Sequence, residues 1–140
     1  MDYMAKCKDK EFDLAIVDPP YGIKESSFRA NPSKCAAKKV DYKRSLWGQK
    51  KPSDEYFTEL FRISEYQIIW GGNYFIDFLR GTRHYIVWDK ETSDSNFADC
   101  ELAWTNYEYS AKIFKYRWNG MLQGDMKNKE HRIHPTQKPV

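Results

Sequence analysis

The sequence predicts an α/β domain built on a mostly parallel sheet that helices cover on both faces. Two observations lead to this prediction. Short apolar runs bounded by breaking residues recur along the chain, and apolar residues at helical spacing lie between the first two of them. Strands that alternate with helices are typical of parallel sheets. The 140 residues, 41% of them apolar, are enough for one domain, and no repeat or second domain is visible.

The first half of the chain contains one predicted strand, one long loop and one helix. The continuous apolar run at residues 14–17 is typical of a strand buried on both faces. Residues 22–51 have no steady period and are predicted to form the loop. The helix is predicted to begin at Ser53, a residue type that caps helices, and acids follow it where the helix dipole is positive. Its apolar stripe consists of Tyr56, Phe57, Leu60 and Phe61.

The second half contains four further predicted strands. Residues 67–70 and 84–88 are apolar runs of strand length, and a short helix is predicted between them at residues 73–80. Residues 100–106 and 111–118 are predicted to form an antiparallel hairpin. We expect this hairpin to lie at the edge of the sheet.

Several classes of protein are disfavoured by composition. No apolar run is long enough to span a membrane, and the N-terminus lacks the apolar core of a signal peptide. The three widely spaced cysteines suit a reducing compartment, so the sequence predicts a cytoplasmic protein. His131 and His134 are too isolated from other ligand types to predict a metal site.

Positive charge is concentrated in residues 29–51, where eight basic residues accompany a single acid, Asp41. Such a run is either a solvated loop or a surface that binds phosphates, because Lys and Arg beside a polyanion release counterions. Charge alone leaves both interpretations open.

The stretch Asp18-Pro19-Pro20-Tyr21 directly follows the first predicted strand. Ligands of open parallel sheets bind beyond the carboxyl ends of the strands. Proline lacks an N–H, so the two prolines end the strand and leave carbonyl oxygens free to accept hydrogen bonds. Together with a carboxylate and a flat ring, these acceptors suit the exocyclic amino group of a nucleobase. The alternative is a plain turn, since Asp and Pro are common in turns.

The DPPY stretch resembles the catalytic motif of the amino-group DNA methyltransferases, which methylate adenine N6 or cytosine N4. HPTQKPV at residues 134–140 resembles a second motif of that family, and IIWGGNYF (68–75) and YIVWDK (85–90) resemble its next strands. The resemblance covers nearly the whole chain. It implies that S-adenosylmethionine is the methyl donor and that the target base is flipped out of the duplex. Asp18 as the first letter of DPPY favours adenine.

The fold implied by the resemblance is part of a mostly parallel, doubly wound, Rossmann-like methyltransferase sheet with a C-terminal hairpin. Residues 1–140 would be the catalytic half of a single domain with the beta-type motif order. The main cofactor cradle of this group, a glycine-rich F-x-G-x-G strand and loop, follows HPTQKP, and the sequence contains no G-x-G. We therefore expect these 140 residues to lack the cofactor-binding half. A downstream segment or a second polypeptide would supply it, and the chain alone is expected to be inactive. An uncovered strand edge would favour self-association.

The resemblance also assigns roles to individual residues. Asp18, Pro19, Pro20 and Tyr21 would be catalytic, and Asp18, Thr136 and Lys138 would contact the cofactor.

Double-stranded DNA is the implied partner. Residues 22–51 correspond to a basic loop over the active site, and residues 112–133 to a candidate target-recognition segment in which Trp118 is either a DNA contact or a core residue. Two alternatives stay open: a non-catalytic DNA-binding remnant of the fold, and a cytosine-N4 or RNA-directed methyltransferase. The predicted DNA-binding residues are Lys38, Lys39, Lys43, Arg44, Lys115 and Arg117.

Overall fold

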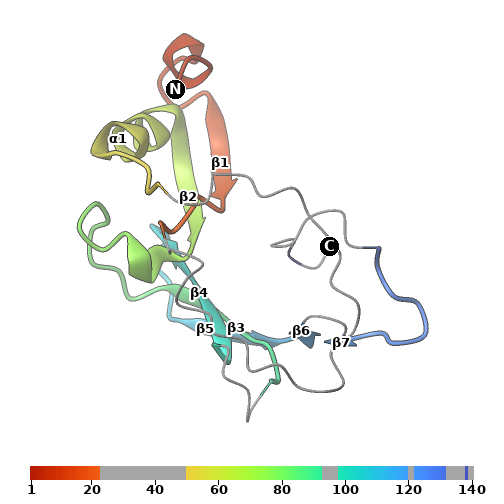
Figure 1. The fold of residues 1–140 in the computed structure, drawn as a ribbon. Coiled ribbons are helices and arrows are strands. Elements are labelled where there is room, and N and C mark those ends of the chain that lie inside the picture. The colour runs from red at the N-terminus through yellow and green to blue at the C-terminus, as the bar shows by residue number, and fades with distance from the viewer. Residues whose placement is uncertain (23–49, 93–97, 120–121, 132–137, 139–140) are drawn as a thin grey trace.

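The structure is a computed structural model that describes most of the chain (Figure 1). The predicted loop at 22–51 lies largely outside the described residues, so its conformation stays a prediction. The described ranges are 1–22, 50–92, 98–119, 122–131 and residue 138.

The described residues form an α/β fold around a mixed sheet of five strands. The strands follow one another across the sheet in the order β1-β2-β4-β3-β5, and a separate two-stranded sheet pairs β6 with β7. The pairs β1–β2 and β3–β5 are parallel, whereas β4 runs antiparallel to both of its neighbours. The α/β class is confirmed, but the sheet is mixed rather than mostly parallel. The bounds are β1 Phe12–Val17, β2 Ser64–Trp70, β3 Tyr85–Asp89, β4 Cys100–Thr105, β5 Lys112–Lys115, β6 Trp118–Asn119 and β7 Leu122–Gln123.

The predicted hairpin of the last two strands is wrong. β4 is inserted between β2 and β3, and β5 lies beyond β3 at the edge of the sheet. Ala103, Trp104 and Thr105 of β4 are all buried, as an interior strand requires, while every residue of β5 is exposed. Both segments have the length and composition of strands, and these local features do not say which neighbour each strand pairs with.

Among the described residues there is one α-helix, α1 (Asp54–Ile63). Ser53 is its N-cap and acids occupy the first turn, as predicted, although the Ser53 side chain makes no capping hydrogen bond. The second predicted helix, at 73–80, is wrong: the chain forms only a short 3₁₀ turn there, η4 (Gly72–Tyr74). A similar turn, η1 (Met4–Lys6), precedes β1. None of the described helices is long and apolar enough to cross a membrane.

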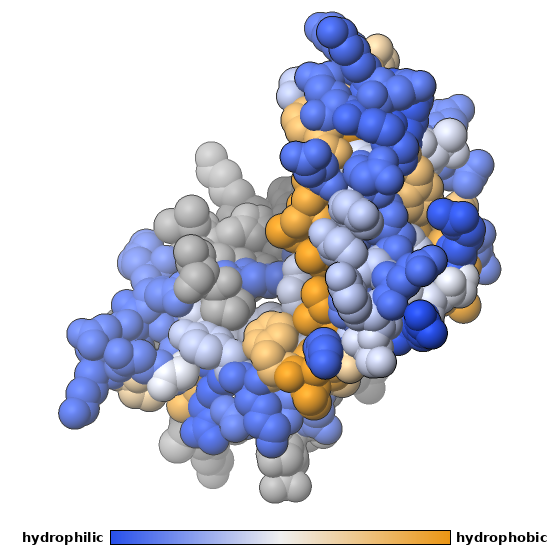
Figure 2. Space-filling view, turned by 180° about the vertical axis from the view of Figure 1, so that it is seen from behind, coloured by the Kyte–Doolittle hydropathy of each residue, from blue (hydrophilic) through white to orange (hydrophobic). Residues whose placement is uncertain are grey.

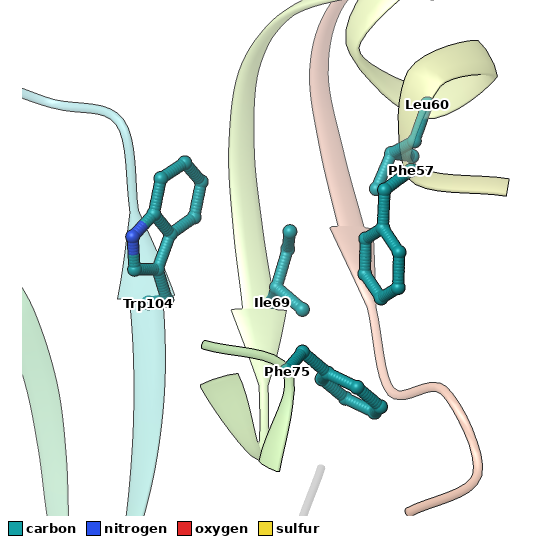
Figure 3. Close-up of a cluster of buried hydrophobic side chains, with 5 residues drawn as sticks. All are labelled: Phe57, Leu60, Ile69, Phe75 and Trp104. Atoms are coloured by element: carbon teal, nitrogen blue, oxygen red, sulfur yellow. The ribbon is translucent and has the colours of Figure 1, made fainter. Parts of the chain in front are cut away.

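The core lies between α1 and one face of the sheet (Figure 3). Phe57 and Leu60 extend from α1 toward Ile69 of β2, and Phe75 and Trp104 complete the cluster. Each of these five side chains is at most 2% exposed. Burying a large apolar side chain contributes about 1.5–3 kcal/mol relative to leaving it in water. The helical stripe predicted from the sequence is therefore what fixes α1 on β1 and β2.

The opposite face of the sheet is not covered by any described helix. Leu14 and Ile16 alternate with the core-facing residues of β1, and both are exposed, as are Tyr66 of β2 and Phe114 of β5. Figure 2 shows hydrophobic residues gathered in a band along one flank of the molecule. The prediction of helices on both faces is thus met on one face only within the described ranges.

Candidate active site

Four segments bring polar and aromatic side chains to one rim of the sheet. β1, β2 and β3 all end at this rim, and β4 begins there because it is antiparallel. Asp18 follows β1, Trp70 ends β2 and Lys90 follows β3, while Glu101 is the second residue of β4. We call this the carboxyl rim. The sequence prediction that Asp18 stands at the carboxyl end of a strand is confirmed.

Both oxygens of the Asp18 carboxylate accept hydrogen bonds from side chains of this chain. The Tyr21 hydroxyl donates to Oδ1 at 2.6 Å, and the Lys138 ammonium donates to Oδ2 at 2.8 Å. Lys138 lies 120 residues away in the sequence. Asp18 is partly exposed, with 37% of its side chain accessible. The carboxylate is thus oriented by two donors and within reach of solvent.

Tyr21 uses both its ring and its hydroxyl. Its ring stacks on Tyr74, with centroids 4.7 Å apart and an interplanar angle of 18°, and meets Phe75 edge-on. Burial, followed by the hydrogen bond and negative charge of Asp18, raises the pKa of Tyr21 well above its ordinary value of 10.0. The phenol therefore stays protonated and acts as a hydrogen-bond donor to Asp18. The sequence predicted a stacking surface; the hydroxyl contact was not anticipated.

Gly71 creates the space for the Tyr21 ring. Its φ is +68°, a left-handed conformation that costs other residues free energy. A Cβ atom at this position would collide with the Tyr21 ring. The glycine that directly follows β2 is therefore required both by the turn and by the placement of Tyr21.

Lys138 links Asp18 to a second carboxylate. Its Nζ lies 2.9 Å from Glu101 Oε2, and Glu101 Oε1 is 2.7 Å from the Nζ of Lys90. Two positive and two negative groups alternate along this chain of contacts. Lys138 Nζ also lies 5.2 Å from the ring centroid of Trp70, within the range of a cation–π interaction.

The two lysines keep Glu101 ionised. Burial opposes its ionisation more than any other single effect, but the hydrogen bonds and charges of Lys90 and Lys138 together outweigh burial. The pKa of Glu101 consequently lies below its ordinary value of 4.5. A half-buried carboxylate that stays charged is a strong fixed anchor for ammonium groups.

An apolar hollow of about 540 Å³ adjoins Asp18. Its size falls in the range of small-ligand sites, roughly 300–1,000 Å³. Flat proline and tyrosine surfaces beside one carboxylate suit a ligand that combines a planar ring with a cationic group. The hollow is lined by Val17, Asp18, Pro19, Pro20, Pro52 and Tyr56.

The structure brings some of the predicted site residues together, places others elsewhere and does not describe the rest. The structure brings Asp18, Tyr21 and Lys138 together, and Pro19 and Pro20 line the adjacent hollow. Lys115 is exposed at the end of β5, 3.8 Å from the Asp89 carboxylate, and Arg117 is exposed two residues later. Trp118 is buried, which supports its interpretation as a core residue. Five predicted residues lie outside the described ranges: Lys38, Lys39, Lys43, Arg44 and Thr136.

Sequence reasoning missed Glu101, Lys90 and Trp70 as members of the site. A signal for Glu101 was present, since it is an acid inside an otherwise apolar strand. Glu101 was not assigned to the site because the predicted hairpin placed its strand at the edge of the sheet, away from Asp18.

Comparison with known proteins adds no assignment to this geometry. No protein-family model matches the chain, and the search of curated proteins gave no match. Within the described residues, no group of three His, Cys, Asp or Glu side chains is placed to hold a metal ion. The inference about function therefore rests on the sequence motifs and on the carboxyl rim.

Proposed function

We propose that this chain is the catalytic half of a DNA methyltransferase that transfers a methyl group from S-adenosylmethionine to adenine N6 of a flipped base. One observation carries the proposal: the Asp18 carboxylate and the Tyr21 ring are held together at the end of a strand, joined by a 2.6 Å hydrogen bond. A directed acceptor beside an aromatic ring is what a planar base bearing an amino group requires.

Methylation of an exocyclic amino group requires hydrogen-bond acceptors at the nitrogen rather than a strong base. The lone pair of an exocyclic amino group is delocalised into the ring, so the nitrogen is a poor nucleophile. If Asp18 and the Pro19 carbonyl each accept one N–H, the nitrogen can become tetrahedral and its lone pair can leave the ring plane. Acceptors oriented in advance for charge that develops in the transition state supply a large share of catalysis. The proton can leave after the nitrogen has become positive.

The residues around Asp18 fit the methyl donor in part. S-adenosylmethionine combines a flat adenine ring with a sulfonium cation and would supply the electrophilic methyl group. Asp18 and the proline-lined hollow of about 540 Å³ offer a carboxylate and apolar flat surfaces to such a molecule. In the same proposal Thr136 contributes to this side of the site, and a glycine-rich loop from another segment or polypeptide completes it.

Double-stranded DNA would be positioned by the basic loop and by residues near the end of β5. Lys115 lies at the carboxyl rim because β5 runs parallel to β3. Lys115 is thus at the same end of the sheet as Asp18, although β5 and β1 are its opposite edge strands, and this position supports a role in holding phosphates of a long ligand such as DNA.

Analysis of methylated nucleosides tests the proposal. The chain is incubated with DNA and labelled S-adenosylmethionine, alone and together with a segment or polypeptide that carries the glycine-rich F-x-G-x-G loop, and the DNA is digested to nucleosides. We expect N6-methyladenine from the combined reaction and no product from the chain alone. N4-methylcytosine would replace the adenine assignment with the cytosine alternative, and loss of transfer in Asp18→Ala ties the product to this site.

A second candidate is a DNA-binding protein that keeps the fold without the chemistry. The contacts of both Asp18 oxygens with Tyr21 and Lys138 favour it, because an incoming amino group would have to share an oxygen with a donor that is already bound there. DNA binding without any methylated product in the combined reaction would select this candidate.

A further inference from the structure

Lys138 occupies the position at Asp18 that an incoming amino group needs. Its Nζ donates to Asp18 Oδ2 at 2.8 Å, while Tyr21 holds Oδ1 at 2.6 Å. An ammonium nitrogen that donates to the carboxylate and lies 5.2 Å from the Trp70 ring centroid resembles a methylated, positively charged amino group of a base. The rim therefore already contains a cation of the kind that the reaction would generate.

This contact would hinder the reaction if it persisted. A positive charge fixed at Asp18 repels the positive charge that develops on the target nitrogen. At about 4 Å and an effective dielectric constant of about 20, repulsion between two full unit charges corresponds to roughly a thousandfold change in rate. The amino group also competes directly with Lys138 for Oδ2.

We propose that Lys138 is a displaceable occupant of the target-amine position, and that it moves from Asp18 onto Glu101 when the base enters. This inference rests on the proposed function. It assigns Glu101 as a positioning residue, which acts on the reaction through Lys138 rather than by touching the base.

Three features of the rim favour this movement. Lys138 Nζ already lies 2.9 Å from Glu101 Oε2, so it keeps one ion pair when it gives up the other. Glu101 is anchored separately by Lys90 at 2.7 Å and does not need to move with Lys138. The Lys138 side chain is 22% exposed, so water can reach the ammonium group during the change.

The same arrangement keeps Asp18 ready in the absence of a target. Lys138 balances the charge of the Asp18 carboxylate and holds its orientation until a substrate N–H replaces the ammonium. Lys138 thus keeps Asp18 available as a charged acceptor. It also excludes groups that bind Asp18 more weakly than an ammonium does.

Nucleoside binding to four variants of the chain tests the inference. Adenosine is titrated into the chain labelled with ¹⁵N-lysine, and the side-chain ammonium signals are followed by NMR; the Lys138 signal is identified by its loss in Lys138→Met. We expect adenosine to shift the Lys138 signal and leave the Lys10 signal unchanged, since Lys10 is bound to the carbonyls of Phe61 and Ser64. N6,N6-dimethyladenosine, which has no amino N–H, should not displace Lys138.

The substitutions at Lys138 and Glu101 should change the affinity for adenosine in opposite directions. Lys138→Met should bind adenosine about tenfold more tightly because the competitor is gone, and Glu101→Gln about tenfold more weakly because Lys138 then stays on Asp18. The double variant Glu101→Gln/Lys138→Met should regain the tighter binding, which a merely structural role of Glu101 would not allow. Lys6→Met is the control, because Lys6 is exposed and precedes the start of β1, whereas Asp18 follows its end.

The outcomes separate this inference from the proposed function. If adenosine perturbs the amide signals of Asp18 and Tyr21 in a second, uniformly ¹⁵N-labelled sample but Lys138→Met weakens binding, Lys138 is a ligand for the base and the inference fails alone. If adenosine perturbs none of these signals in either the wild-type chain or Lys138→Met at its solubility limit, the proposed function fails and the inference fails with it.

Discussion

The Lys138 ammonium and the Asp18 carboxylate are 2.8 Å apart although 120 residues separate them in the sequence. This contact joins DPPY and HPTQKPV, the two stretches that resemble methyltransferase motifs, at one point of the fold. The same ammonium contacts Glu101, so three distant segments meet around one positive charge. Any change at the carboxyl rim is therefore expected to act on all three.

Asp18→Ala should abolish methyl transfer in the combined reaction while DNA binding survives. Removing one oriented hydrogen-bond partner of a transition state typically costs about 10²–10³ in rate. Transfer of labelled methyl groups and a gel-shift assay measure the two properties separately. Asp13→Ala, at an exposed acid of the same strand, is the matched control. Near-normal turnover of Asp18→Ala would rule out the proposed mechanism.

Tyr21→Phe and Tyr21→Ala should differ in stability. The Phe variant keeps the stack on Tyr74 and loses only the donor to Asp18, so we expect a loss of about 1 kcal/mol in the free energy of unfolding. The Ala variant also loses the packed ring, and the loss should reach about 2–4 kcal/mol. Urea unfolding measures both, with the exposed Tyr109→Ala as control. Equal losses would mean that the ring contributes nothing beyond its hydroxyl.

Gly71→Ala should destabilise the protein by at least about 2 kcal/mol, because it combines a left-handed backbone with overpacking against Tyr21. Gly81→Ala is the matched control, since an added Cβ there has no neighbour within 4 Å. Its free energy of unfolding should stay within about 0.5 kcal/mol of wild type. If the two variants unfold at the same urea concentration, Tyr21 does not occupy the space above Gly71.

Ionised Glu101 should stabilise the fold at neutral pH but not in acid. Its pKa is lower in the folded chain than its ordinary value of 4.5, so its contribution is present above that value and is lost as the pH falls through the lowered pKa. The wild-type chain should therefore lose more stability than Glu101→Gln between neutral pH and the acid range below about 4.5. Urea unfolding at a series of pH values measures the difference. Glu108→Gln, at an exposed glutamate, should follow the wild-type curve.

Neutralising the basic loop should weaken DNA binding about equally for all sequences. Replacing Lys38, Lys39, Lys43 and Arg44 by Gln should also reduce the salt dependence of the affinity, by about one unit of slope for each phosphate that the loop no longer neutralises. Fluorescence anisotropy at several salt concentrations gives this slope. The same charge change at four exposed residues elsewhere (Lys6, Lys8, Arg80 and Arg83) is the control. An unchanged slope in the loop variant would show that the loop is only solvated.

Much of the fold could be predicted because its signals are local. The apolar run of β1, the stripe of α1 and the apolar cores of β2 and β3 were all found at nearly their observed positions. Each depends on the periodicity of a few neighbouring residues, which places Phe57 and Leu60 on one apolar face of α1. The second helix was predicted from the same kind of local signal, the helical spacing of Phe75 and Phe78, but the chain forms only the 3₁₀ turn η4 there, after the left-handed Gly71.

The sequence by itself determined that Asp18 and Tyr21 follow a strand, since breakers act on the residues beside them. Only the tertiary structure decided what surrounds them. Whether β4 pairs with β5 or enters between β2 and β3 depends on burial across the whole sheet, and this choice carries Glu101 to the carboxyl rim. The approach of Lys138 to Asp18 is likewise a contact between segments that share no local pattern. Charge pairing across such distances depends on the geometry of the assembled sheet, which local sequence does not specify.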